Sequence, residues 1–251
     1  MALISDLVSA VAEVEGLPEA TVALAARYAR EAGLLSQGAR GRNAPRATVA
    51  DCANLLIAVN ASGCVVKDAP HAIESYRRLR LHVAHGGRSE RLQSVQYQDI
   101  EHDELRFLRK SEGRSFGEVL EAVIERFVGG EMETFMMGEA SKYLGESFFE
   151  KAAEDLGDDK KALAERVIDS CRSLLRLDTV RFDIKFHRPT PYAELSVSRS
   201  VGATNETLAS ANFIVTMEDM KAGRIKGGGD RKDVTSIGYA TFMKIAEVMR
   251  Q

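Results

Sequence analysis

The sequence predicts a mainly α-helical protein with a smaller α+β part at the C-terminus. Up to about residue 178, apolar side chains recur every three or four residues, which is the spacing of amphipathic helices. From Val180 onward, apolar and polar side chains alternate, which is the period of half-buried strands. The 251 residues, 45% of them hydrophobic and 28% charged, suit a globular chain of one to three domains.

Two helices are predicted at the N-terminus. Leu3 to Glu15 has apolar residues at helical spacing, and Gly16-Leu17-Pro18 ends this stretch. Pro18 suits the first turn of a second helix, because that position needs no backbone N–H. The second helix extends to about Ala32, and Gly33 is a natural C-terminal cap.

A loop and a third helix complete the first 62 residues. Ser36 to Ala47 contains glycines, a proline and three arginines, so we expect a loop or a short hairpin. Thr48 can cap the helix that follows, with Asp51 at its third position, where a carboxylate favours the helix N-terminus. Gly63 ends this third helix.

Three further helical patterns lie between residues 63 and 178. His71 to Val83 has apolar side chains on one side and arginines on the other, and Asp159 to Leu177 is also amphipathic. The segment from His85 to Tyr97 is ambiguous, because Gly86-Gly87 interrupts the pattern. The strongest helical stripe is a candidate oligomer interface and consists of Phe116, Leu120, Val123, Ile124 and Phe127.

Strands are predicted after residue 178. Val180 to Phe186 alternates clearly, and Ala193 to Ser198 alternates after a turn at Pro189-Thr190-Pro191, so the two strands should pair. The rest of the chain is predicted as a third strand over residues 212–217, a glycine-rich loop over 224–230 and a closing helix over 235–249. The predicted domains are therefore residues 1–62, a helical region over 63–178 that can serve oligomerisation, and 179–251.

Charge is distributed unevenly along the chain. The net charge of the whole chain is −3, but residues 21–91 hold 11 basic and 5 acidic residues, a net of +6. Residues 101–165 hold 9 basic and 17 acidic residues, a net of −8. The positive charge thus lies around the second helix and the loop after it, where a nucleic-acid partner would need it.

The stretch from Thr21 to Arg46 carries the functional hypothesis. Thr21-Val22 is followed after ten residues by Gly33-Leu34-Leu35, and then by the glycine- and arginine-rich segment GARGRNAPR. This arrangement resembles the winged helix-turn-helix of bacterial regulators and of DNA-binding proteins of phages and prophages. The resemblance covers about residues 1–60 and implies a recognition helix for the major groove followed by a basic wing.

The resemblance also implies which residues contact DNA. The candidate recognition-helix residues are Thr21, Leu24, Arg27 and Arg30, and the candidate wing residues are Arg40, Arg42 and Arg46. The face that anchors the helix on its neighbour would consist of Val22, Ala25, Ala26 and Ala29. Leu24 departs from the family pattern, because many of these regulators have a polar or basic residue there. It either contacts a thymine methyl group or is buried.

The expected function is sequence-specific binding of double-stranded DNA by a cytoplasmic homodimer, as in a phage- or prophage-type transcriptional regulator. One alternative is a small-terminase-like DNA-packaging protein, which would form a ring. Another is an interaction module whose winged helix binds protein. An enzyme built on the C-terminal strands is a third alternative, but no combination of nucleophile, base and oxyanion donors is visible, so no enzyme is expected.

No cofactor, metal or membrane is expected. Cys52, Cys64 and Cys171 are odd in number and lack C-x-x-C spacing, so we interpret them as free thiols in a reducing cytosol. His82 and His85, with His102 nearby in sequence, have a spacing compatible with metal binding on a helix, but such pairs also arise by chance. The acidic N-terminus is unlike a signal peptide, and no apolar run is long enough to span a membrane.

Overall fold

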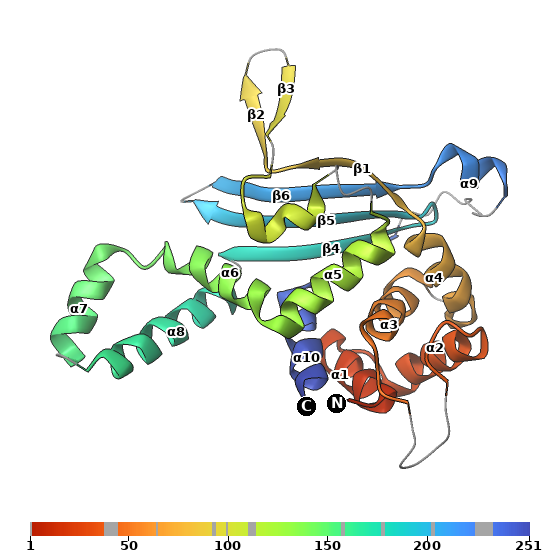
Figure 1. Ribbon diagram of the computed structural model, residues 1–251, viewed down its shortest axis with the longest axis horizontal. Coiled ribbons are helices and arrows are strands. Elements are labelled where there is room, and N and C mark those ends of the chain that lie inside the picture. The colour runs from red at the N-terminus through yellow and green to blue at the C-terminus, as the bar shows by residue number, and fades with distance from the viewer. Residues whose placement is uncertain are drawn as a thin grey trace.

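Helices pack on one face of a five-stranded antiparallel sheet, and a separate two-stranded sheet projects beside it (Figure 1). The computed structural model describes residues 2–37, 45–63, 65–91, 94–98, 100–109, 114–156, 159–176, 179–201, 204–223 and 233–251. The expectation of a mainly helical chain with a smaller α+β part is confirmed at this level.

The helices within these ranges are α1 (Ile4–Glu15), α2 (Glu19–Glu31), α3 (Val49–Ala61), η2 (Val66–Asp68), α4 (Ala69–Arg77), η3 (Asp103–Leu108), α5 (Phe116–Gly129), α6 (Glu131–Ser141), α7 (Glu146–Leu156), α8 (Lys160–Arg176), α9 (Met217–Lys221) and α10 (Tyr239–Arg250). The strands are β1 (Arg80–His85), β2 (Gly87–Arg91), β3 (Ser94–Gln98), β4 (Val180–Arg188), β5 (Tyr192–Val201), β6 (Thr204–Ile214) and β7 (Asp233–Gly238).

The main sheet has the strand order β1-β6-β5-β4-β7, and every neighbouring pair is antiparallel. The predicted pairing of the strands on either side of Pro189-Thr190-Pro191 is confirmed, with Ile184 opposite Leu195. Phe182, Ile184 and Phe186 are buried, whereas the side chains between them are more exposed. The period of two therefore separates a helix-covered face from an open face.

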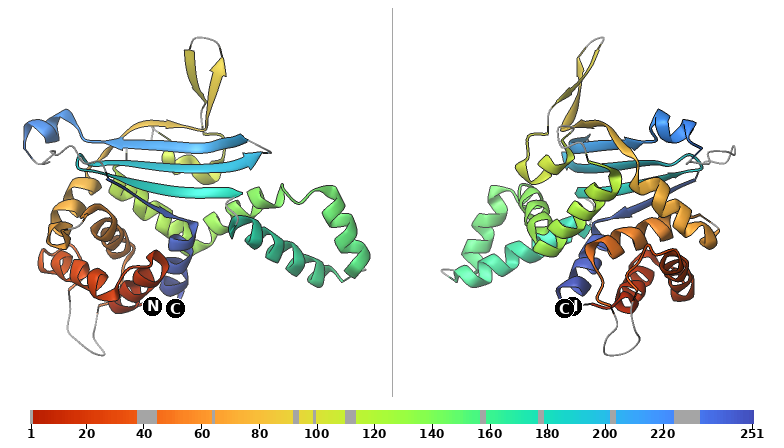
Figure 2. Two further views of the ribbon diagram at one scale, coloured as in Figure 1. Left: turned by 180° about the vertical axis from the view of Figure 1, so that it is seen from behind. Right: turned by 45° about the vertical axis from the view of Figure 1, so that its right-hand side comes forward.

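One hydrophobic core joins the N-terminal helices to the sheet. Helix α3 lies near its centre, with ten of its thirteen residues buried, and it contacts α1, α2, α4, α5, β4 and β7. Helix α10 packs against α1 and α5, which brings the two chain ends close together (Figure 2). Residues of all three predicted domains therefore contribute to one hydrophobic core.

Helices α6, α7 and α8 form an arm that extends away from the rest of the molecule in all views (Figures 1 and 2). Its base is tied to the sheet, because Arg199 on β5 donates to the buried carboxylate of Glu139 on α6 at 2.8 Å. The predicted helix over residues 159–177 is confirmed as α8. Among the described residues, none of the helices combines the length and apolar character that a membrane crossing requires.

Three predictions about elements are wrong. The helix expected over His71 to Val83 ends at Arg77, and β1 begins at Arg80 and pairs with β6. The third strand ends at Ile214 rather than residue 217, and the helix expected from residue 235 begins at Tyr239 after strand β7. In both edge-strand regions, pairing with distant strands outweighs a local pattern that also fits a helix.

The stripe on α5 was expected to serve as an oligomer interface, and this expectation is also wrong. Its five side chains are at most 1% exposed. They pack inside the chain against the sheet and against α3 and α10; Phe127, for example, stacks on Phe242 with 5.2 Å between ring centroids. A face that is already buried in the protomer is not available to a second copy.

Candidate functional site

Helices α1 and α2 are joined by a tight turn at the surface. Gly16 has φ +64°, a left-handed conformation that glycine adopts without strain, and the N–H of Leu17 donates to the carbonyl of Ala12 at 2.9 Å. Pro18 then starts α2, and the N–H of Thr21 donates to its carbonyl. The predicted helix, turn and second helix are therefore present.

Helix α2 has one buried face and one exposed face. The predicted anchoring residues are at most 2% exposed, and they are Val22, Ala25, Ala26 and Ala29. On the opposite side, Leu24 is 38% exposed and Arg27 and Arg30 are also exposed, while Thr21 is half-buried. Of the two positions considered for Leu24, burial is thus wrong, because this side chain faces outward.

The Gly-Leu-Leu segment returns the chain to the core after α2. Gly33 has φ +74°, and Leu35 is 3% exposed. The amide of Asn54 on α3 donates to the carbonyl of Leu34 at 2.6 Å, and Arg77 in turn donates to the Asn54 oxygen at 2.8 Å. The end of α2 is therefore fixed to the centre of the fold.

A buried carboxylate joins the two ends of the basic segment. Asp51 on α3 accepts hydrogen bonds from the N–H and hydroxyl of Ser36, at 2.7 and 2.8 Å, and from the N–H and hydroxyl of Thr48, both at 2.8 Å. Burial alone would raise the pKa of Asp51, but these hydrogen bonds outweigh it and hold the pKa below its usual value. The Thr48 cap predicted for α3 is confirmed.

The candidate wing residues can be placed only in part. Arg40 and Arg42 lie outside the described residues. Arg46 is exposed and forms an isolated antiparallel bridge with Leu3, and the next N–H, of Ala47, donates to the carbonyl of Ala2 at 2.9 Å. Arg46 therefore lies beside the start of α1, and α1 packs against α2 (Figure 1).

The exposed face of α2 is not uniformly basic. Arg27 donates to Glu31 at 2.7 Å, and the two side chains are 70% and 55% exposed. A pair this exposed contributes little to stability, and it is readily exchanged for another partner. Ala20 and Ala23 are exposed on the same side, so the side chains in the middle of this face are short.

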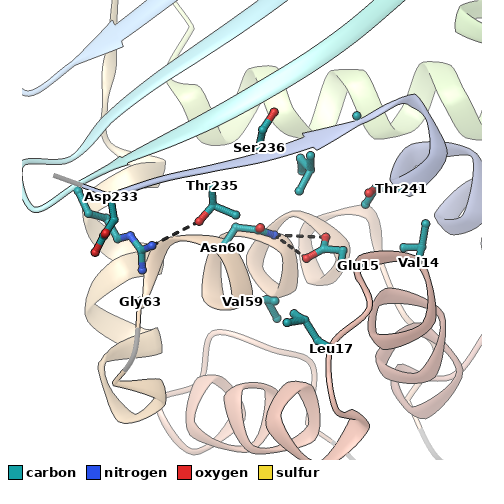
Figure 3. A pocket seen from close by; sticks show the side chains of 13 residues that line it. Val14, Glu15, Leu17, Val59, Asn60, Gly63, Asp233, Thr235, Ser236 and Thr241 are labelled. Atoms are coloured by element: carbon teal, nitrogen blue, oxygen red, sulfur yellow. Dashed lines mark hydrogen bonds between the residues drawn. The ribbon is translucent and has the colours of Figure 1, made fainter. Parts of the chain in front are cut away.

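A polar cavity of about 570 Å³ lies directly behind the α1–α2 turn (Figure 3). It lies between α1, α3, β7 and the end of β4. The lining residues are Val14, Glu15, Leu17, Val59, Asn60, Gly63, Arg188, Asp233, Thr235, Ser236, Ile237, Gly238 and Thr241. The cavity therefore joins the N-terminal helices to the far edge of the sheet.

Glu15 is the most strongly perturbed group in the cavity. The Asn60 amide donates to both of its carboxylate oxygens, at 3.3 and 3.1 Å. Burial raises the pKa of Glu15 to about 7, and the Asn60 hydrogen bond offsets this only partly. Glu15 forms no ion pair with a lysine or arginine in the described ranges. Lys244 on α10 pairs instead with Glu13, at 2.9 Å.

Arg188 borders the cavity from the end of β4. Its Nη2 donates to the Thr235 hydroxyl at 3.4 Å, and its Nε is buried without a hydrogen-bond partner. The guanidinium lies against Gly63, where a Cβ would clash with Nη1. Gly63 also has φ +68°, so both the backbone conformation and the close approach of Arg188 require glycine there.

The cysteines and histidines lie as follows within the described ranges. Cys52 and Cys171 are buried free thiols, and burial raises the pKa of Cys52 to about 12; Cys64 lies outside these ranges. His82 and His85 lie on strand β1 and not on a helix end as expected. The same ranges contain no cluster of three or more histidine, cysteine or acidic residues suited to a metal ion.

Sequence reasoning identified the α2 surface and missed the cavity. Glu15 and Asn60 each occur in an apolar helical stretch, which is a signal for a buried polar pair, but only the packing of α1 on α3 brings them together. Arg188 joins them through the sheet, from a distant part of the chain. Searches against known protein families, curated proteins and solved structures found no significant match to this chain.

Proposed function

We propose that the chain is a sequence-specific DNA-binding protein of the winged helix-turn-helix type. In this proposal it is a phage- or prophage-type transcriptional regulator of the cytoplasm, and α2 is its recognition helix. The observation that carries the proposal is the division of α2 into a buried alanine-rich face and an exposed face with Leu24, Arg27 and Arg30. A recognition helix needs this division, because one side must be held while the other enters the major groove.

The exposed face suits close approach to a groove. Ala20 and Ala23 add little bulk, so the helix backbone can lie near the bases. Arg27 and Arg30 can then reach phosphates or guanine edges, and Leu24 can contact a thymine methyl group. Arg46, together with Arg40 and Arg42 from the same basic segment, would contact the DNA phosphates on either side of the groove that α2 enters.

Acidic neighbours limit the affinity of a single copy. Glu31 pairs with Arg27, and Glu19 is exposed at the start of α2. A second copy would compensate, because two linked half-sites bind far more tightly than one. We therefore propose a homodimer. The mass of the protein in solution, measured by light scattering, distinguishes a dimer from the ring expected of a small-terminase-like protein.

The test is fluorescence anisotropy with a labelled duplex over a series of salt concentrations. The double variant Arg27→Ala/Arg30→Ala should weaken binding and reduce the log–log salt slope by about 0.9 for each lost phosphate contact. Lys161→Ala/Arg172→Ala is the matched control, since it removes two exposed cations from α8, each within reach of an acidic neighbour. The Glu31→Gln variant should bind about threefold more tightly, because it removes a negative charge close to the phosphates.

The results separate the candidate functions. Equal losses in both double variants would mean that binding is non-specific and does not use α2. Absence of binding at low salt would overturn the proposal and favour a module that binds protein.

A further inference from the structure

We propose that the cavity behind the α1–α2 turn binds a small organic cation, whose protonated nitrogen lies against Glu15. The proposal does not depend on DNA binding, because it rests on the lining of the cavity alone. The ligand class it names is an amine with a hydrogen-bond acceptor at its other end.

The size and lining of the cavity suit a small molecule. A volume of about 570 Å³ lies within the range of ordinary ligand sites. Val14, Leu17, Val59 and Ile237 provide apolar surface, and hydroxyl and amide groups lie between them. A lining that combines apolar side chains with several polar groups can both contact the hydrocarbon part of a ligand and fix its orientation.

The charges of the lining favour a cation. Glu15 carries the decisive charge, because its carboxylate accepts from the neutral Asn60 amide. Lys244 on α10 is the cation closest in sequence to Thr241, but it pairs with Glu13. A bound monocation would neutralise Glu15.

Glu15 defines where that cation would lie. Its carboxylate accepts hydrogen bonds from one neutral amide, and two oxygens retain further acceptor capacity. A buried carboxylate is stable in its charged form only with a cation or several donors. An ammonium group satisfies this need with three N–H donors.

Arg188 defines the other end of the ligand. Figure 3 shows Glu15 and Thr235 on either side of Asn60, and the Thr235 hydroxyl accepts a hydrogen bond from Arg188. The unpartnered Nε of Arg188 and the hydroxyl of Thr235 can both donate to a carbonyl, hydroxyl or carboxylate oxygen. The ligand would therefore reach across the cavity from α1 to the β4–β7 edge.

The experiment is isothermal titration calorimetry of the full chain, without DNA, against ethanolamine, 4-aminobutanol and 5-aminopentanol, each of which joins one ammonium group to a hydroxyl group. Succinate and glutarate serve as acids of similar size. We expect at least one amine to bind and Glu15→Gln to weaken its binding at least tenfold. Glu74→Gln is the control, because it removes the same charge from an exposed position on α4 outside the cavity lining.

The pH dependence gives a second readout. Because the pKa of Glu15 is about 7, amine affinity should be about tenfold lower near pH 6 than near pH 8 in the wild type. Glu15→Gln should lose this dependence. Val59→Met, which fills the cavity from α3 without changing its charge, should also weaken amine binding. This variant provides an independent test if Glu15→Gln does not fold.

Three results would overturn the proposal. The first is that none of the amines binds, and the second is that amine binding is equal in the wild type and Glu15→Gln. The third is that the acids bind and the amines do not, which would assign the cavity to anions held by Arg188.

Discussion

At the residue scale, the buried carboxylate of Asp51 connects local structure to the candidate DNA surface. It holds Ser36 and Thr48 together, and these residues flank the segment that contains Arg40, Arg42 and Arg46. Helix-capping rules predict the Thr48–Asp51 pair from sequence. They cannot predict the Ser36 contacts, because those depend on how the chain returns from α2.

We predict that Asp51→Asn destabilises the protein by about 2 kcal/mol at neutral pH, since charged hydrogen bonds are replaced by weaker ones. The pKa of Asp51 is lowered by folding, so its stabilising contribution is present above the unfolded value of 3.8 and is lost as pH falls through the lower folded value. Urea unfolding at neutral and acid pH measures this. The exposed Asp68→Asn variant is the control, and equal effects in both variants would contradict the prediction.

Glu15 has the opposite pH dependence. Its folded pKa of about 7 is higher than the unfolded value of 4.5, so its contribution to stability is fully present below 4.5 and is lost as pH rises through 7. We predict that Glu15→Gln stabilises the ligand-free protein near pH 8, by on the order of 2 kcal/mol, and much less near pH 5. Denaturant titrations at the two pH values test this, with the exposed Glu74→Gln as the variant that should show no such difference.

At the element scale, the spacing of apolar residues in the sequence correctly predicts those helices and strands that bury one continuous apolar face. Helix α5 and strands β4 and β5 belong to this group, because each packs one continuous face on the core. Strands β1 and β7 do not. They are the two edge strands of the sheet. They become strands because they pair with β6 and β4, and the local spacing of apolar residues carries no information about these distant partners.

Gly63 follows the end of α3 and lies against Arg188 in the cavity lining. We predict that Gly63→Ala costs about 2 kcal/mol or more, because φ is +68° and the new Cβ would displace Arg188. Gly16→Ala is the matched control, with φ +64° and open space around the position, and it should cost about 1 kcal/mol. Thermal unfolding of both variants, alone and combined with Arg188→Ala, measures the difference. If Arg188→Ala does not reduce the cost of Gly63→Ala, the clash is not its cause.

At the scale of the whole molecule, the hydrophobic core links the proposed DNA-binding helices to the sheet. The sequence predicts a boundary near residue 62, because the resemblance to a winged helix-turn-helix covers about residues 1–60 and Gly63 ends the third helix. Helix α3, however, contacts both groups of elements, and Leu56 at its centre is fully buried. A ligand in the cavity would touch the same two groups, since the lining includes both Glu15 and Arg188.

This arrangement predicts that a core substitution in α3 weakens both halves of the fold together. Leu56→Ala should destabilise the protein by about 2–5 kcal/mol, because it leaves a cavity among tightly packed side chains. Hydrogen exchange should then show reduced protection in α1 and α2 and also in β4, by a similar factor, because all three pack on α3. Loss of protection confined to α1, α2 and α3 would instead indicate that residues 1–62 unfold on their own. In that case the cavity would lie between two separately stable units, and a bound ligand would have to hold them together rather than fill a gap in one core.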